Sequence, residues 1–111
     1  MNLMDAIRRN KSEFISLCSG HEVKKLYAFG SSTNSAFNEK LSDIDLLVEI
    51  ETIDPINRGE NLMDLWEKFE LFFNRKVDLL TTSSIRNPIL RKSIDSSKIL
   101  IYDGKEQKVF I

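Results

Sequence analysis

Several residue types are scarce in this sequence of 111 residues, and each scarcity excludes a class of site or protein. There is one cysteine, Cys18, so an internal disulfide is excluded. There is one histidine, His21, so a histidine-rich zinc site is excluded. Four glycines and two prolines are too few for a chain dominated by loops. No apolar run approaches the roughly 20 residues that a membrane-spanning helix needs.

The charged residues are nearly balanced. Lys and Arg total 16 and Asp and Glu total 17, which gives a formal net charge of −1. Without a basic excess, attraction to nucleic acid phosphates is not expected to be the main role of the protein. The N-terminal segment MNLMDAIRRNKSEF is charged throughout and has no apolar signal core. We therefore expect a cytoplasmic protein with one domain over residues 1–111 and no membrane partner.

Hydrophobic spacing predicts helices that alternate with strands. Helices are expected over residues 2–18, 57–74 and 88–96, and strands over residues 23–30, 43–51, 76–81 and 98–102. The small, polar residues 31–41 allow a short helical turn, and residues 107–111 are expected to form a last strand or a loose tail. Asn57 with Glu60 resembles a capping box, and Asn87 before Pro88 is typical of a helix start. This order predicts an α/β (α+β) fold, with a mixed sheet of about four to five strands and helices packed on it.

The clearest helical stripe lies in residues 57–74. Its apolar members are Leu62, Leu65, Trp66, Phe69, Phe72 and Phe73. We expect this stripe to form much of the core against one face of the sheet, rather than a cofactor site. Cys18, Tyr27 and Tyr102 are also expected to be packing residues, and His21 to be structural or solvated.

Two aspartates in the second predicted strand suggest a metal site. Asp43 and Asp45 are separated by one residue, so their carboxylates point to the same side of a strand. Neighbouring carboxylates repel each other and raise each other's pKa unless a cation lies between them. Magnesium is commonly held by one or two carboxylates together with substrate phosphates. An isolated pair of this kind is more often a solvent-facing strand start, so its neighbours decide the interpretation.

The preceding strand ends at Gly30-Ser31, which is compatible with phosphate binding. Glycine leaves room for a phosphate to approach the backbone, and Ser31 offers a hydroxyl and an N–H to its oxygens. If Ser31 also opens a short helix, the end of that helix favours an anion. A phosphate cradle beside two metal-binding acids predicts a site for a nucleoside triphosphate and Mg²⁺.

A third aspartate interrupts the next apolar strand. Asp78 lies between Val77 and Leu79, and an unpaired buried carboxylate costs several kcal/mol, so such a residue usually has a partner or a task. It is a candidate to hold a second metal ion and to act as base on an attacking hydroxyl. The alternative is a strand-end acid in water.

In combination these motifs resemble a known family. YAFGSS (27–32), SDIDLLVE (42–49) and KVDLLT (76–81) are similar to the motifs of the DNA polymerase β-like nucleotidyltransferase superfamily. The chain looks most like the minimal nucleotidyltransferases (MNT proteins), which are small single-domain proteins. Its C-terminal segments NPILRKSI and KILIYD also look like theirs. The resemblance covers nearly the whole chain and implies the palm-like nucleotidyltransferase fold.

The resemblance implies a role for each matching residue. Gly30, Ser31 and Ser32 would bind the triphosphate, and Asp43 and Asp45 would ligate Mg²⁺, with Mn²⁺ as a substitute. Asp78 would be the third carboxylate of the metal site, near the attacking hydroxyl. The reaction would be in-line attack on the α-phosphorus of ATP, with pyrophosphate leaving.

One segment departs from the family pattern. Many members follow Gly-Ser with a basic turn of the kind RARG, and this sequence has Ser32-Thr33-Asn34-Ser35 instead. The missing arginines remove phosphate contacts. The basic residues available to replace them are Arg58, Arg75, Lys76, Arg86, Arg91 and Lys92, and the sequence does not show which of these lies near the site.

The resemblance also suggests an acceptor, and three hypotheses remain open. Minimal nucleotidyltransferases are commonly encoded beside a helical HEPN-type toxin, so the first hypothesis is an antitoxin that transfers AMP to a tyrosine of such a toxin. The second is a binding module with a weak or silent site that inhibits a helical partner by docking. The third is an enzyme that modifies a small molecule such as an antibiotic. A chain of this length is expected to borrow its acceptor surface from another protein or from a second copy of itself.

Overall fold

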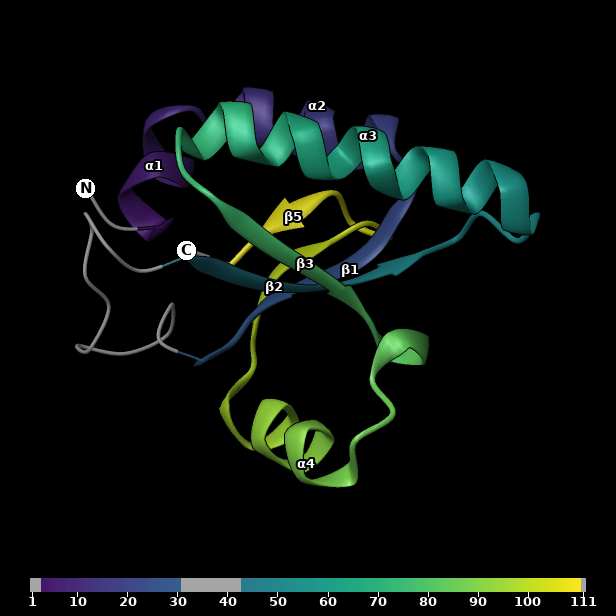
Figure 1. The fold of residues 1–111 in the computed structure, drawn as a ribbon. Coiled ribbons are helices and arrows are strands. Elements are labelled where there is room, and N and C mark those ends of the chain that lie inside the picture. Colours follow the sequence, from purple (N-terminus) through teal and green to yellow (C-terminus); the bar gives the residue numbers. More distant parts are fainter. Residues whose placement is uncertain (1–2, 31–42, 111) are drawn as a thin grey trace.

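The computed structural model describes residues 3–30 and 43–110, and the predicted turn over residues 31–41 lies outside this range. Five strands form one mixed sheet (Figure 1). In the order β3-β2-β1-β4-β5 they are β3 (Val77–Thr81), β2 (Ile44–Ile50), β1 (Val23–Ala28), β4 (Ile99–Asp103) and β5 (Lys108–Val109). The pair β2–β3 is parallel and the other pairs are antiparallel. The predicted α+β fold is confirmed, and the C-terminal segment forms a strand.

Helices lie on both faces of the sheet (Figure 1). α1 (Leu3–Arg9), α2 (Lys11–Gly20) and α3 (Pro55–Phe73) cover one face, and α4 (Pro88–Ser97) lies on the other. The larger core is formed between the first three helices and the sheet, and includes Ile7, Phe14, Cys18, Leu65, Phe69 and Tyr102. A smaller cluster under α4 contains Phe29, Leu47, Ile85 and Ile94. The expectation that Cys18 and Tyr102 are core residues is therefore confirmed.

The N-terminal segment forms two helices, so the prediction of one helix over residues 2–18 is wrong. Asn10 separates α1 from α2 with backbone angles outside the helical region (φ −131°, ψ 48°). The break follows from the apolar pattern, because Lys11 interrupts the stripe. With the chain turned at Asn10, Ile7 of α1 and Phe14 of α2 are both fully buried.

α3 begins earlier than predicted. Its cap is Asp54, whose side chain accepts a hydrogen bond of 3.0 Å from the Asn57 N–H, and Pro55 occupies the first turn. The predicted capping box at Asn57 and Glu60 is wrong, because the Asp-Pro pair starts the helix three residues upstream. The predicted cap Asn87 is confirmed, since its side chain accepts from two backbone N–H groups in the first turn of α4.

The aromatic stripe of α3 is buried to different degrees. Phe69 is fully buried, Phe72 and Phe73 are half-buried against the core, and Trp66 is 37% exposed. Trp66 lies at the rim because its indole N–H donates to the carbonyl of Val77, at 2.7 Å. The prediction of a core stripe holds for the phenylalanines and is wrong for Trp66.

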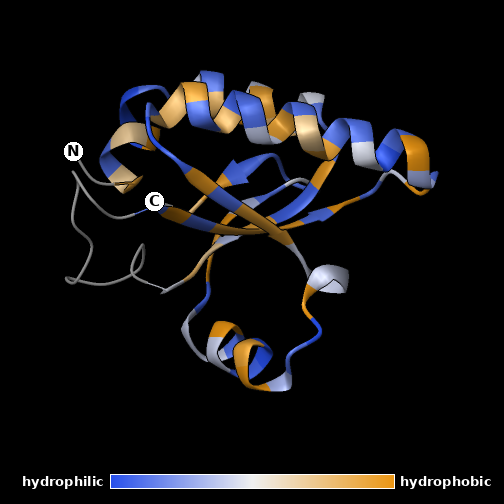
Figure 2. Cartoon of the chain, viewed as in Figure 1, coloured by the Kyte–Doolittle hydropathy of each residue, from blue (hydrophilic) through white to orange (hydrophobic). Residues whose placement is uncertain are grey.

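Figure 2 shows hydrophilic and hydrophobic residues mixed along α3. None of the helices within 3–30 and 43–110 combines the length and apolar character needed to cross a membrane.

Side chains cover the outer edge of β3. At its start, Trp66 donates to the Val77 carbonyl and the Val77 N–H donates to Glu70 Oε2 at 3.0 Å. At its end, the Thr81 N–H donates to Ser84 Oγ at 3.2 Å, and that hydroxyl donates back to the Thr81 carbonyl at 2.8 Å. An open strand edge is a template for pairing with other chains. These contacts occupy two positions of the edge and disfavour such pairing.

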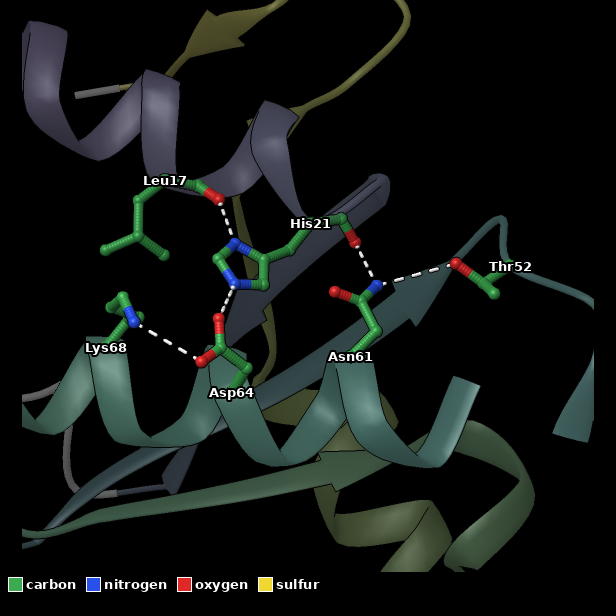
Figure 3. Close-up of polar contacts among 6 residues, drawn as sticks. All are labelled: Leu17, His21, Thr52, Asn61, Asp64 and Lys68. Atoms are coloured by element: carbon green, nitrogen blue, oxygen red, sulfur yellow. Dashed lines mark hydrogen bonds and ion pairs between the residues drawn. The ribbon is translucent and has the colours of Figure 1, made fainter. Parts of the chain in front are cut away.

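His21 caps the C-terminal end of α2 and connects this helix to α3 and to the segment after β2 (Figure 3). Its ring contacts the Leu17 carbonyl through Nδ1 at 2.7 Å and Asp64 Oδ2 through Nε2 at 2.6 Å. Both partners accept hydrogen bonds, so a ring protonated on both nitrogens satisfies both contacts. The Asn61 side chain donates to the His21 carbonyl and to Thr52 Oγ1. The structural interpretation of His21 is confirmed.

Candidate functional site

The parallel pair β2–β3 brings two of the predicted acids together. Asp45 and Asp78 are register partners in this pair, which places their backbones about 4.8 Å apart. Asp43 directly precedes β2, one step before the first paired residues, Ile44 and Val77. The structure therefore gathers all three predicted carboxylates at the start of these two strands.

The acids lie on the face of the sheet that α4 covers. Side chains alternate along a strand, so Asp45 shares a face with Leu47, and Asp78 shares a face with Leu80. Leu47 belongs to the small cluster under α4, and Leu80 packs against it. Asp45 is half-buried and Asp78 is exposed, so the third acid is open to an incoming group.

Gly30 lies directly against Asp45. The Phe29 N–H donates to the Asp45 carbonyl at 3.1 Å, which holds the end of β1 beside the start of β2. Gly30 has a φ of 63°, in the left-handed region that glycine adopts at little cost. A Cβ at this position would lie 2.9 Å from Asp45 Oδ2. A side chain at residue 30 would therefore push into the acidic group, which explains why this position needs glycine.

Burial and repulsion between the acids both disfavour the ionised form of Asp45, and burial is the larger of the two effects. Burial, the neighbouring carboxylates of Asp78 and Asp43, and a hydrogen bond with Asp78 raise the pKa of Asp45 from 3.8 to about 6. Since all these causes disfavour the ionised form, the arrangement stores unfavourable negative charge. A cation bound among these carboxylates would remove the penalty.

Two of the six candidate cations, Lys76 and Arg91, have contacts near the ends of β3. Lys76 Nζ lies 4.0 Å from Asp43 Oδ2. The Arg91 guanidinium donates to the carbonyls of Thr82 and Ile85, at 2.9 Å each, so it holds the chain between β3 and α4. Arg58 lies in the first turn of α3, whose other end leads into β3. Sequence reasoning listed Lys76 without separating it from the other five.

Comparison with known proteins identifies the family. The family model described as "Polymerase beta, Nucleotidyltransferase" matches residues 12–107. The chain belongs to this nucleotidyltransferase family. Two proteins of Methanocaldococcus jannaschii named as protein adenylyltransferases are similar to it. One is 37% identical over 81 residues, which is 73% of this chain and 79% of the relative. The other is 33% identical over 99 residues, covering 89% and 94%.

Solved structures share the fold. A minimal nucleotidyltransferase superposes with a TM-score of 0.62 at 25% identity, covering 89% of this chain and 95% of the other. A toxin–antitoxin structure with AMP-PNP gives 0.59 at 23% identity, covering 88% and 77%. The MNT antitoxin complex with the tri-AMPylated HEPN toxin of Shewanella oneidensis gives 0.51 at 22% identity, covering 89% and 74%.

In this nucleotidyltransferase, the predicted site residues fall into two groups. Gly30, Asp43, Asp45 and Asp78 lie together, whereas Ser31 and Ser32 are outside the described residues. Within the described ranges, no group of three or more His, Cys, Asp or Glu side chains is arranged to hold a metal ion by itself. The oxygen donor set nevertheless suits Mg²⁺, because this ion commonly takes one or two carboxylates and completes its shell with phosphate oxygens and water.

Proposed function

We propose that the protein is a magnesium-dependent adenylyltransferase that transfers AMP from ATP to a hydroxyl group, and that its acceptor is a tyrosine of a HEPN-type toxin. The observation that carries this proposal is the register pair Asp45–Asp78 with Asp43 beside it, facing a glycine that has no room for a side chain. The family assignment supports nucleotidyl transfer, and the names of the archaeal relatives support a protein acceptor.

Each acid has a distinct part in the proposed reaction. Asp43 and Asp45 hold the ion, which supplies charge neutralisation and alignment of the triphosphate when bound. Asp78 is the exposed member, so its carboxylate is accessible to a hydroxyl presented by another protein. It accepts the hydroxyl proton as the oxygen attacks the α-phosphorus. The new bond joins that oxygen to phosphorus, the bond to the bridging oxygen of the β-phosphate breaks, and pyrophosphate leaves.

The solved complexes support the acceptor class. One similar fold is an MNT antitoxin in complex with an AMPylated HEPN toxin, and another is a toxin–antitoxin pair with an ATP analogue. A protein acceptor also agrees with the open position of Asp78, since a second molecule is able to reach the edge of the sheet from solvent.

The test compares label transfer from α-labelled and γ-labelled ATP. Purified protein, Mg²⁺ and a HEPN-type protein from the same cell are incubated together, with Asp43→Asn beside the wild type. Asp95→Asn is the matched control, because that carboxylate is 55% exposed and pairs with Lys98 on α4. We expect label on the HEPN-type protein from α-labelled ATP alone, lost in Asp43→Asn and kept in Asp95→Asn.

Two other results would change the conclusion. Label from γ-labelled ATP would contradict nucleotidyl transfer. Inhibition of the HEPN-type protein by Asp43→Asn as strong as that by wild type, with no label on either, would favour the docking module instead.

A further inference from the structure

One basic side chain is placed directly beside the acidic group. The Ile44 N–H donates to the Lys76 carbonyl at 3.0 Å, so the backbone of Lys76 is fixed to the start of β2. Lys76 comes immediately before β3, and Asp43 immediately before β2. Asp43 and Lys76 therefore come one residue before the register pair Ile44–Val77. Asp45 and Asp78 come one residue after it and form the next register pair.

The same alternation that groups the acids includes the lysine. Lys76 and Asp78 are two residues apart, as are Asp43 and Asp45, so all four side chains start from one face of the two strands. The result is a two-by-two arrangement. One cross-strand pair, Asp43 and Lys76, has opposite charges, and the other, Asp45 and Asp78, has like charges.

The contact between Lys76 and Asp43 is loose enough to change on ligand binding. Lys76 Nζ lies 4.0 Å from Asp43 Oδ2, and the lysine side chain is 68% exposed. An exposed ion pair of this kind contributes little to stability, typically between 0 and about 1 kcal/mol. The ammonium is therefore held near the acids without being locked to them, and its long stem lets it turn toward a new anion.

We propose that Lys76 is a phosphate-binding residue that contacts the triphosphate of the bound nucleotide and takes the place of the arginines missing after Gly30-Ser31. This inference rests on the proposed function. A triphosphate bound through a metal ion on Asp43 lies next to the Lys76 ammonium, which then exchanges a carboxylate partner for a phosphate oxygen. Lysine binds phosphate as a mobile point charge, so the open geometry suits it.

Two of the other candidates, Arg91 and Arg58, are engaged or placed differently. Arg91 donates to two backbone carbonyls, and losing those bonds would release the loop before α4. Arg58 is in the first turn of the 19-residue α3, so roughly 22 Å of helix separates it from the end that leads to β3. Lys76 requires no rearrangement of the fold to reach a ligand at the acids.

The experiment measures binding rather than turnover. The Kd values of ATP and of tripolyphosphate, which has no base or sugar, are determined by calorimetry in excess Mg²⁺. The proteins are the wild type, Lys76→Met, Lys76→Arg, Asp43→Asn and Lys105→Met. Lys105 is a suitable control because it is exposed in the turn after β4, beside the start of β1 and at the opposite end of that strand from Gly30.

We expect Lys76→Met to weaken both ligands about tenfold, the size of one charge-assisted contact. Lys76→Arg should stay within about threefold of the wild type, and Lys105→Met should be unchanged. Thermal unfolding checks that Lys76→Met folds as the wild type does. Equal affinity for ATP in Lys76→Met and the wild type, with loss in Asp43→Asn, would overturn the role of Lys76 and leave the proposed function standing. A wild-type protein that binds neither ligand would overturn both.

Discussion

Asp45 and Asp78 are direct register partners in the parallel pair β2–β3, and the repulsion between them contributes to a pKa of about 6 for Asp45. Like charges placed opposite each other weaken a sheet, so this pair opposes folding in the absence of a cation. Structures tolerate such a cost where a ligand later removes it. The fold therefore places its electrostatic strain at the point where a metal-bound nucleotide is proposed to bind.

Replacing the Asp45 carboxylate with a neutral amide should stabilise the metal-free protein at neutral pH. The folded pKa of Asp45 lies above its ordinary value of 3.8, so the folded state holds the proton more tightly. Stability therefore falls as pH rises from about 3.8 to about 6, and the full cost is present above pH 6. We expect Asp45→Asn to gain about 1 kcal/mol at pH 7.5, a value reduced for solvent screening, and much less at pH 4. Urea unfolding without metal at both pH values measures this.

Asp78→Asn provides the matched control for that prediction. Either substitution removes one member of the repelling pair, so the double variant should gain less than the sum of the single gains. Strict additivity would show that the two carboxylates do not interact, in conflict with their register.

Gly30→Ala should damage both the fold and the site. Alanine at a φ of 63° costs about 1–2 kcal/mol, and the added Cβ would lie 2.9 Å from Asp45 Oδ2. We expect a loss of unfolding free energy of this size and weaker Mg²⁺-dependent ATP binding, because Asp45 must move. Gly59→Ala is the control, since a Cβ there has nothing within 4 Å and α3 should gain up to about 1 kcal/mol. Unchanged ATP binding in Gly30→Ala would argue against close packing of Gly30 on the acids.

The contact between His21 and Asp64 predicts a different pH dependence. Hydrogen bonds from His21 and Lys68 hold the pKa of Asp64 below its ordinary value of 3.8. The stabilisation by Asp64 is therefore present above about pH 3.8 and is lost as pH falls below it. Asp64→Asn should lower the melting temperature at pH 6 and lower it less at pH 3. Asp95→Asn, which removes an exposed ion pair with Lys98, should have little effect at either pH. An equal effect of Asp64→Asn at both pH values would contradict this account.

The sequence pattern predicted the helices and strands better than it predicted which residues on different elements contact one another. The two-residue period of a strand is a local signal, and it was enough to find Asp43 and Asp45 on one face and Asp78 within an apolar run. The register that pairs Asp45 with Asp78 depends on how two strands align in space. The family resemblance implied only that Asp78 belongs to the same metal site as Asp43 and Asp45. The contact of His21 with Asp64 spans 43 positions, and nothing local in the sequence indicates it. The same holds for the contact of Lys76 with Asp43, which appears only when β3 is placed beside β2.

Phe14 is one of the three largest fully buried side chains in the described part of the chain, so its loss should be costly. Its ring is fully buried, and its centroid lies 5.9 Å from that of Phe69 and 5.4 Å from that of Phe72. Phe14→Ala removes these contacts and leaves a cavity between α2 and α3, so we expect a loss of about 3–5 kcal/mol in urea unfolding. Ile53→Ala is the control, because that side chain is 91% exposed and should change stability by less than about 0.5 kcal/mol. A loss below about 1 kcal/mol in Phe14→Ala would mean that α2 is held mainly by other contacts, such as those of His21 with Asp64.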